Sequence, residues 1–347
     1  MTSRVGDVIL VLRRAADITQ EELANALGIT QAALSRYEND LRDPDDDMIG
    51  KLGVALGVTP EFLRHQFRMH GAIAADAHMR RQKTAKPTEW KRVEAQLNLL
   101  RMHSSYLLER VPLRPQNHVI QVDPGERTPA DAASMLRASW RMPIGPVRNL
   151  FRWVESAGVI IVEADFGTHR IDGMSQWAGD HAVITLNSAM PTDRKRLTVA
   201  HELGHLVLHT AYIDSDVEDQ ANDFAAEFLM PEHIIRPQLH NLTLGKLEDL
   251  KLEWGVSMQA VFERAYRLGK ATPEERQKFY RQMNSRGWKV REPNSELIPQ
   301  ETPELAASVG QRLTESGLTE REIQQLIGSR DGGSTPFTPA RRALRTV

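Results

Sequence analysis

Cysteine is absent from the 347 residues of this sequence, and long apolar runs are absent as well. Without cysteine the chain can form no disulfide and offer no thiolate ligand, so any metal site must use His, Asp or Glu. Without eighteen consecutive apolar residues we expect no transmembrane helix. The first residues also lack the apolar core and small-residue cleavage site of a secretory signal. Together these absences predict a cytoplasmic protein with no membrane partner.

Net charge is also small, because 44 basic and 46 acidic side chains leave a formal charge of -2. Hydrophobic residues make up 41% of the chain, which is enough for a sizeable core, and the length predicts two or three domains. The charges are unevenly spread: residues 1–70 hold eight basic and eleven acidic side chains, and residues 71–115 hold nine basic and four acidic ones. The charge of the whole chain therefore neither supports nor excludes nucleic acid as a partner.

The N-terminal part of the chain predicts short helices joined by tight turns. Thr19 is expected to cap the second helix with Glu22 as its capping-box partner, and Gly28 is expected to end that helix. Thr30 has the position of a cap for a third helix. The segment DITQEELANALGITQAALSRYENDLRDP resembles the helix-turn-helix of XRE/Cro-type repressors over residues 5–65.

This resemblance implies that the third helix enters the major groove of operator DNA, with its first residues against base edges. Glutamine can pair with adenine there, and arginine with guanine. The resemblance also implies an internal ion pair between Arg13 and Glu38. Asp40 departs from the family pattern, because it stands where a glycine is common, and aspartate tolerates left-handed backbone less well. The residues that are predicted to contact DNA are Gln20, Gln31, Ala32, Arg36 and Arg42.

The acidic balance of this domain conflicts with DNA binding, which depends largely on the neutralisation of phosphates. The basic segment 71–115 could supply the missing charge, although a solvated helix face explains that segment at least as well. A homodimer could instead concentrate Arg13, Arg36 and Arg42 at the groove. The domain could also bind a protein in place of DNA.

The sharpest chemical signal is the sequence HELGH, which begins at His201. On a helix His201 and His205 lie one turn apart on the same face, so both imidazoles can bind one metal ion. Glu202 is rotated by about 100° from His201, which suits a general base that acts on water at this metal. The flanking residues are mostly apolar, so we expect a largely buried helix whose polar rings need partners.

A catalytic zinc takes three protein ligands and leaves a fourth position open. The predicted helix at 215–230 offers Glu218 on its inward face, where a carboxylate is costly to bury unless it pairs with a charge or a metal. Asn222 lies one turn later and could hold a metal-binding histidine. The pattern alone leaves other carboxylates open as the third ligand, namely Asp214, Asp216, Asp219 and Asp223.

The segments RKRLTVAHELGHLVLH and EDQANDFAAEFLMP resemble the ImmA/IrrE family of metallopeptidases, and the resemblance covers roughly residues 130–293. In that family the glutamate four residues before the asparagine of the second helix is the third zinc ligand. The resemblance therefore implies Zn²⁺ held by His201, His205 and Glu218, with Glu202 as the catalytic general base. It also implies limited cleavage of a protein substrate, a helix-turn-helix repressor.

Several polar residues near the motif have weaker cases. His209 continues the stripe eight residues after His201, but a third histidine in line is crowded, so an interaction with the helix dipole is favoured. The strand predicted at 182–187 could pair with an extended substrate by β-augmentation, or could be an ordinary sheet strand. His169, His181 and His233 are expected to be surface or loop histidines, although one of them, or Tyr212, could stabilise an oxyanion.

Helical periodicity predominates in the rest of the chain. Trp90, Val93 and Leu97 recur at helical spacing in a long polar segment, and VIIVEA at 159–164 and HAVITLN at 181–187 predict strands. We therefore expect an α+β protein: an all-α helix-turn-helix domain, a helical linker, and a mainly helical zincin-like domain with a small sheet. The predicted parts are the helix-turn-helix at 1–65, a basic helical linker at 66–128, the peptidase domain at 129–293, a helical region at 294–329 and a disordered tail at 330–347.

Three functions fit these features. The first is a regulatory zinc metalloendopeptidase that makes limited cuts in a repressor-like protein, or in itself, and so controls transcription in a stress response. The second is a transcription regulator that uses the peptidase fold as a ligand or metal sensor. The third is the antitoxin-like component of a two-gene switch. The intact metal motif favours the enzyme, because a sensor has no need of a general base.

Overall fold

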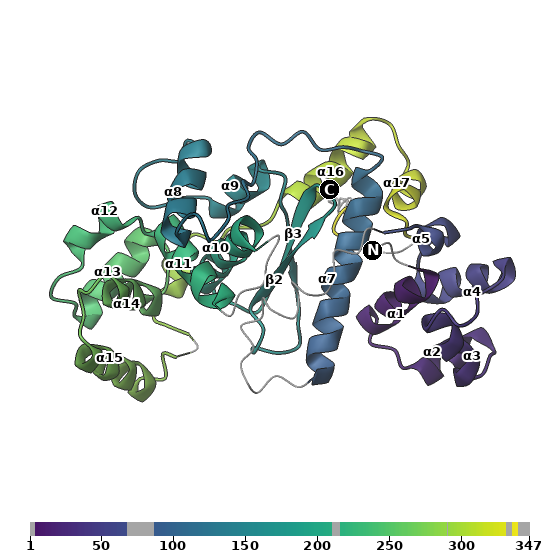
Figure 1. Ribbon diagram of the computed structural model, residues 1–347, viewed down its shortest axis with the longest axis horizontal. Coiled ribbons are helices and arrows are strands. Elements are labelled where there is room, and N and C mark those ends of the chain that lie inside the picture. Colours follow the sequence, from purple (N-terminus) through teal and green to yellow (C-terminus); the bar gives the residue numbers. More distant parts are fainter. Residues whose placement is uncertain (1–3, 68–86, 210–215, 290, 331–334, 339–347) are drawn as a thin grey trace, which may run out of the picture.

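The computed structural model describes residues 4–67, 87–209, 216–289, 291–330 and 335–338. Most of the chain is helical, and the described residues contain a small three-stranded sheet that lies between two groups of helices (Figure 1). The predicted α+β class is therefore confirmed. Among the described residues, no helix combines the length and the apolar character that crossing a bilayer requires.

The N-terminal domain packs short helices around a small core of its own. Thr19 and Glu22 form the predicted capping box, and Gly28 ends the second helix with a left-handed φ of 69°. Asp40 also has a positive φ, of 52°, and its Oδ1 accepts a hydrogen bond from the Gly6 N–H at 2.9 Å. The aspartate thus occupies a position that favours glycine and gains a bond that glycine could not make. The helices are α1 (Val5–Ala15), α2 (Gln20–Leu27), α3 (Gln31–Glu38), α4 (Asp46–Leu56) and α5 (Pro60–Arg64).

Helix α7, which spans Pro87–Leu108, lies between the N-terminal domain and the sheet (Figure 1). Met102 and Tyr106 on one side join the core of the N-terminal domain. Val93 and Leu97 on the other side join a second core that includes residues of the sheet and of the C-terminal helices. The described part of the predicted linker therefore includes a helix that contributes residues to both cores. This shared packing holds the N-terminal domain against the sheet.

Two basic residues of α7 serve this packing. Arg101 is buried, and burial lowers the pKa of its guanidinium to about 10. Arg92 donates a hydrogen bond to the carbonyl of Phe166 at 2.7 Å. The solvated helix face that the sequence suggested is therefore wrong for Arg101. The basic residues at 80–86 lie outside the described residues.

The sheet has the strand order β1-β3-β2, with β1 at Ile160–Ala164, β2 at Gly173–Ala178 and β3 at His181–Asn187. Strand β3 pairs with β1 in parallel and with β2 antiparallel, so both of its edges are filled. The prediction that this strand could offer an edge to substrate is therefore wrong, and an ordinary central strand is what the structure has. Strand β2 was not predicted, because its sequence GMSQWA buries polar residues and has no regular apolar alternation.

The largest core packs residues of β3 against the helices on the face of the sheet that is opposite α7. Helices α10 (Thr192–Leu208) and α11 (Val217–Leu229) pack closely, because a Cβ at Gly204 would already lie 3.0 Å from the Phe224 ring. The other elements of this region are α8 (Pro129–Ser139), α9 (Leu150–Ser156), α12 (Glu232–Ile235), η1 (Arg236–Gln238), α13 (Leu244–Trp254), α14 (Met258–Arg267), α15 (Pro273–Ser285) and η2 (Ser295–Leu297).

The C-terminal helices α16 (Leu305–Glu315) and α17 (Glu320–Ile327) return the chain to the N-terminal domain. The Thr59 N–H donates to the Gly328 carbonyl at 3.0 Å, in a short bridge between the two ends of the chain. Phe337 is fully buried, so the disorder predicted for the tail does not hold at 335–338. The rest of that tail, apart from Arg330, lies outside the described residues.

Candidate metal centre

The HELGH motif lies in the C-terminal half of α10, and most residues of this helix are buried. Apolar residues surround it on the same helix, and His201 and His205 are themselves only 6% and 2% exposed. Their Nε2 atoms lie 3.0 Å apart, with the two rings nearly perpendicular at 84°. Two ring nitrogens that converge in a buried place, with at most one proton between them, form half of a metal site.

Glu218, in the first turn of α11, completes the cluster. Its carboxylate lies 3.5 Å from His201 Nε2 and 3.3 Å from His205 Nε2, and one ligand atom from each residue falls within a 4.8 Å cluster. Both carboxylate oxygens are buried, and neither accepts a well-formed hydrogen bond from the described residues. Burial works to raise the pKa of Glu218, but the hydrogen-bonding contacts and charges of the two histidines outweigh it and hold the pKa well below its usual range.

The competing carboxylates on this helix are directed elsewhere. Asp223 pairs with Arg267 of α14, and Asp219 lies 3.8 Å from the same guanidinium. Asp216 is exposed at the start of α11, and Asp214 lies outside the described residues. Among the described residues, Glu218 is therefore the acidic group that converges with the two histidines.

Each of the two histidines also contacts a polar side chain through its other ring nitrogen, Nδ1. His201 Nδ1 lies 3.2 Å from Asn222 Oδ1, at the position suggested by the sequence. His205 Nδ1 lies 2.9 Å from Nδ1 of His209, which caps the end of α10 and is buried. The sequence analysis missed this second contact, although the four-residue spacing of the two histidines could have revealed it.

Glu202 is 2% exposed and lies between His201 and His205 in the sequence. Ser175 of β2 donates a hydrogen bond from Oγ to Glu202 Oε2 at 2.7 Å. Burial raises the pKa of Glu202 to about 7, while the charge of His201 and the bond from Ser175 pull it down and Glu218 pushes it up. Ser175 escaped the sequence analysis because its strand did.

The three histidines suggested as oxyanion groups are not ligand candidates of the metal cluster. His169 and His233 are exposed. His181 begins β3, where burial lowers the pKa of its imidazole. None of these three is part of the His-His-Glu group found among the described residues. Tyr212 lies outside the described residues.

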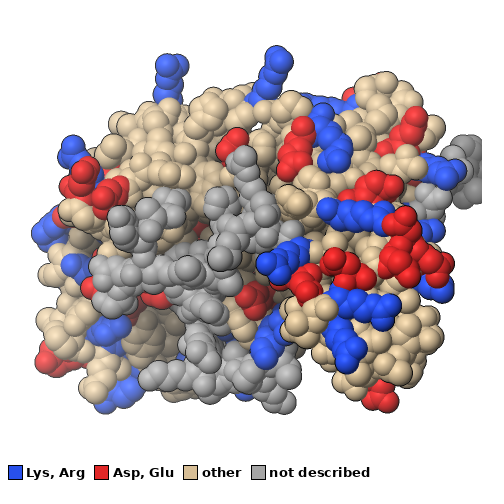
Figure 2. Space-filling view, turned by 45° about the vertical axis from the view of Figure 1, so that its right-hand side comes forward, with Lys and Arg blue, Asp and Glu red and all other residues tan. Residues whose placement is uncertain are grey.

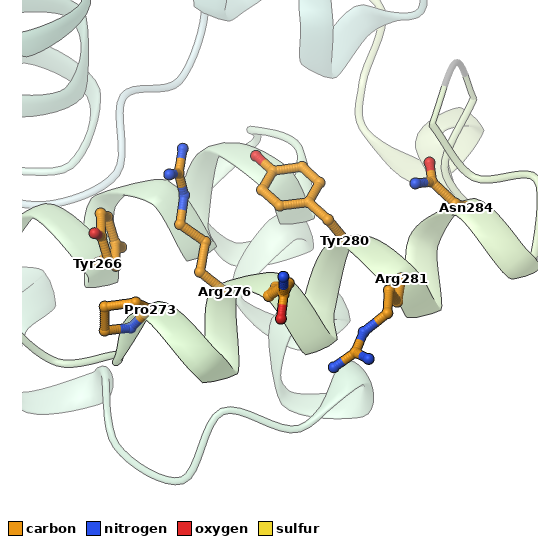
Figure 3. Close-up of a pocket in the computed structure, with 7 residues that line it drawn as sticks. Tyr266, Pro273, Arg276, Tyr280, Arg281 and Asn284 are labelled. Carbon is orange, nitrogen blue, oxygen red and sulfur yellow. The ribbon is translucent and has the colours of Figure 1, made fainter.

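A hollow of about 410 Å³ lies over α14 and α15 and shares no residue with the metal cluster (Figure 3). Two of its lining residues bond to Glu263, which accepts hydrogen bonds from Arg276 Nε at 2.8 Å and from Tyr280 Oη at 2.7 Å. The guanidinium of Arg276 also lies 4.8 Å from the ring centre of Tyr266. None of the residues that line the hollow is a histidine or a carboxylate, so its lining offers no metal ligand of that kind. The residues that line the hollow are Tyr266, Pro273, Arg276, Gln277, Tyr280, Arg281 and Asn284.

The residues predicted to contact DNA lie on or beside α3, and α7 separates them from α10 and α11 (Figure 1). Gln31, Ala32 and Arg36 are exposed on α3. Arg42 is exposed after that helix, with its guanidinium 5.9 Å from the ring centre of Tyr37. The face is therefore open, and Figure 2 shows acidic and basic side chains interspersed on the side turned forward.

Gln20 differs from the other predicted DNA contacts, because it is half-buried. Its Nε2 donates to Glu38 Oε2 at 2.6 Å, and its Oε1 accepts a long bond of 3.4 Å from Gln31. Glu38 also pairs with Arg13 at 2.5 Å, which is the internal ion pair that the resemblance implied. The side chain of Gln20, one of the predicted DNA contacts, is thus hydrogen-bonded to the internal ion pair.

Comparison with known proteins gives two family matches. Residues 154–266 match the IrrE N-terminal-like domain of the M78 peptidases, and residues 9–63 match the helix-turn-helix family. The radiation response metalloprotease IrrE of Deinococcus radiodurans is 38% identical over 74 aligned residues, which take in 17% of this chain and 23% of that protein. The alignment thus covers less than a quarter of that relative's length.

The two matches fall on the two parts of the structure that carry separate features. One contains the buried His-His-Glu cluster, and the other contains the exposed helix α3. The M78 family implies a metal cofactor, and the cluster is where the described residues can hold one. The chain thus combines a segment that matches the helix-turn-helix family, at residues 9–63, with a segment that matches the IrrE N-terminal-like domain of the M78 peptidases, at residues 154–266.

Proposed function

We propose that this chain is a zinc-dependent endopeptidase that makes limited cuts in a regulatory protein, and that its N-terminal domain brings it to operator DNA or to that protein. The observation that carries the proposal is the buried cluster of His201, His205 and Glu218, with Glu202 beside it. Two imidazoles, one carboxylate and a neighbouring general base form the set that hydrolytic zinc sites use.

The residues fit zinc on their own chemistry. The two Nε2 atoms converge, and the buried oxygens of Glu218 accept no well-formed hydrogen bond from the described residues, although both histidines contact them. A bound cation would compensate this buried negative charge, which is otherwise costly. When bound, zinc supplies Lewis-acid chemistry: it makes water more acidic and polarises a carbonyl.

Glu202 is suited to move the proton in this reaction. It would accept a proton from the attacking water and return it to the leaving amine. Burial holds its pKa at about 7, where it can do both at neutral pH. The Ser175 hydroxyl holds Oε2, which leaves Oε1 of the same carboxylate for the water.

The burial of the cluster supports limited cleavage. An enclosed cluster can be reached only by an extended segment, so a folded target would be cut at a flexible loop or linker. A partner held by the N-terminal domain would meet the site at a raised effective concentration. We therefore expect weak activity on free peptides and strong activity on one partner, for which a helix-turn-helix repressor or this chain itself is the candidate.

The printed name of the relative concerns a radiation response, and a stress-linked switch is the role that we propose by analogy. Operators bound by such domains are commonly two-fold, so a homodimer on DNA belongs to the proposal. The sensor and the antitoxin-like alternatives make a different prediction, because neither needs Glu202 to act as a base.

The test compares cells that express the wild type with cells that express Glu202→Gln, with protein fragments identified by mass spectrometry. Glu315→Gln makes the same chemical change at an exposed position and is the matched control. One or a few cuts that depend on Glu202 and persist in the control would support the proposal. Broad cleavage of unrelated proteins would refute limited proteolysis. Identical fragment patterns would favour the ligand-sensing regulator.

A further inference from the structure

A chain of hydrogen-bonded side chains begins at His205 on α10 and ends at Gln220 on the neighbouring helix α11. His205 Nδ1 lies 2.9 Å from His209 Nδ1, and His209 Nε2 lies 2.7 Å from Gln220 Oε1. His205 and His209 are buried, at 2% and 7% exposure, so water does not readily replace either bond. Gln220 belongs to α11, two residues after Glu218. The chain therefore connects the two helices that hold the metal cluster.

The chemistry of the three groups gives the chain a direction. An amide oxygen can only accept, so the bond to Gln220 places a proton on His209 Nε2. A neutral imidazole with a proton on Nε2 presents a lone pair at Nδ1. His209 Nδ1 is then the acceptor, and His205 Nδ1 is the donor. His205 Nε2 is thereby left with its lone pair, and this atom lies 3.3 Å from Glu218 and 3.0 Å from His201 Nε2.

If these hydrogen bonds had the reverse direction, His205 could not bind the metal through Nε2. If the amide nitrogen of Gln220 faced His209, each bond would reverse and His205 Nε2 would carry the proton. A protonated nitrogen cannot bind a metal. His201 reaches the same tautomer by a shorter route, because Asn222 Oδ1 lies 3.2 Å from its Nδ1. Helix α11 thus supplies one ligand candidate and, directly or through His209, a partner for each histidine.

We propose that His209 and Gln220 are positioning residues that fix the tautomer and ring orientation of His205, and so set the metal affinity of the site. This inference rests on the proposed metal centre. Partners behind a metal-binding histidine commonly change metal affinity by about 10–100-fold when they are removed. His209 is therefore neither a fourth ligand nor only a residue at the helix end.

The experiment measures the zinc dissociation constant of the full-length protein by competition with a chelator. We expect His209→Phe and Gln220→Leu each to weaken zinc binding by about 10–100-fold, while zinc still saturates the site at high concentration. Because the two residues act through one chain, the double variant should be no weaker than His209→Phe alone. His209→Asn, which offers an acceptor oxygen near the former Nδ1, should restore most of the affinity. His240→Phe, at an exposed histidine, is the control.

Unchanged affinity in both single variants, or losses that simply add in the double variant, would overturn the proposal. A ¹⁵N NMR measurement on the metal-free protein provides a separate readout at neutral pH. We expect the proton of His205 on Nδ1 in the wild type, and a mixture of tautomers in Gln220→Leu. A wild type that binds no zinc would refute the metal centre, and the His205 tautomer would then decide whether the chain of bonds exists. A His205 proton on Nε2 in the wild type would show that it does not.

Discussion

Helices α10 and α3 carry the two functional motifs of this chain, and they present them in opposite ways. Helix α10 buries its motif, and the polar atoms of His201 and His205 converge inside the protein. Helix α3 exposes Gln31 and Arg36, whose side chains face solvent. A buried polar motif needs partners to fold at all, so its geometry is complete before any substrate arrives. The exposed side chains of α3 acquire their partners only when the domain binds another molecule.

This contrast predicts that the two functions can be separated by single substitutions. The largest effect is expected for Glu202→Gln, which removes the general base but keeps the size of the side chain. Peptide hydrolysis should fall by about 10²–10⁴-fold, whereas metal content and DNA binding should not change. Turnover of the cleaved partner, metal analysis and DNA titration measure the three quantities. A variant that loses its metal together with its activity would show that Glu202 has a structural role instead.

The contacts of α7 with α5 and α17 should become less stable at low pH. His103 of α7 is buried, stacks on Phe62 at 4.6 Å and hydrogen-bonds the Ile327 carbonyl through Nδ1 at 2.8 Å. Burial lowers the pKa of His103 to about 4, so the folded state binds its proton less tightly than the unfolded state does. The stability that depends on neutral His103 is therefore complete above pH 6.5 and is lost as pH falls through about 4, by about 3 kcal/mol.

His103→Gln isolates this effect, because glutamine can donate to Ile327 and does not titrate. Urea unfolding between pH 7 and pH 4, followed for both proteins, gives the difference in the free energy of unfolding. The wild type should lose more stability than the variant across this range. Parallel curves would mean that protonation of His103 does not destabilise the fold.

On the exposed helix, Arg36→Ala should weaken binding to the selected DNA site by about 1–3 kcal/mol and relax its specificity at one base position. Zinc content and hydrolysis should stay at the wild-type level, since α7 separates α3 from α10 (Figure 1). The measurement is a titration of DNA sites selected from a random pool at low salt. A pool in which nothing is enriched would support the protein-binding interpretation of this acidic domain.

The smallest expected effect concerns the turn after α3. Asp40→Ala loses the bond to Gly6 and keeps the positive φ, so we expect a loss of about 1 kcal/mol in the free energy of unfolding. Asp40→Asn retains an acceptor oxygen and tolerates left-handed backbone, so its stability should lie near that of the wild type. Thermal unfolding compares the two. Equal losses would indicate that the side-chain bond contributes nothing.

The contrast between α10 and α3 also explains what the sequence could predict. Thr19, Gly28 and the HELGH spacing act within a few residues, so local rules were sufficient for the helices and for the cluster's two histidines. Ser175 and Gln220 act across the fold, and no local pattern marks them. Strand β2 was missed because buried polar residues break its alternation, and those same residues include the one that holds Glu202.

The charge asymmetry shows the same limit. The basic segment appeared as an exposed polar helix, because composition cannot distinguish a solvated arginine from a buried one. In the structure Arg101 is buried on α7, the helix that both cores share. Burial is a property of the assembled fold, so the function of such residues can be assigned only from coordinates.

The most direct test of the central claim is the metal content of the full-length protein. After equilibration with zinc and removal of the excess, the wild type should hold about one zinc per chain. His205→Ala and Glu218→Ala should lose most of it, and Asp219→Asn, one residue from Glu218 on a face directed to Arg267, should retain it. A wild type without zinc, or a Glu218→Ala variant that binds zinc as tightly as the wild type, would contradict the account.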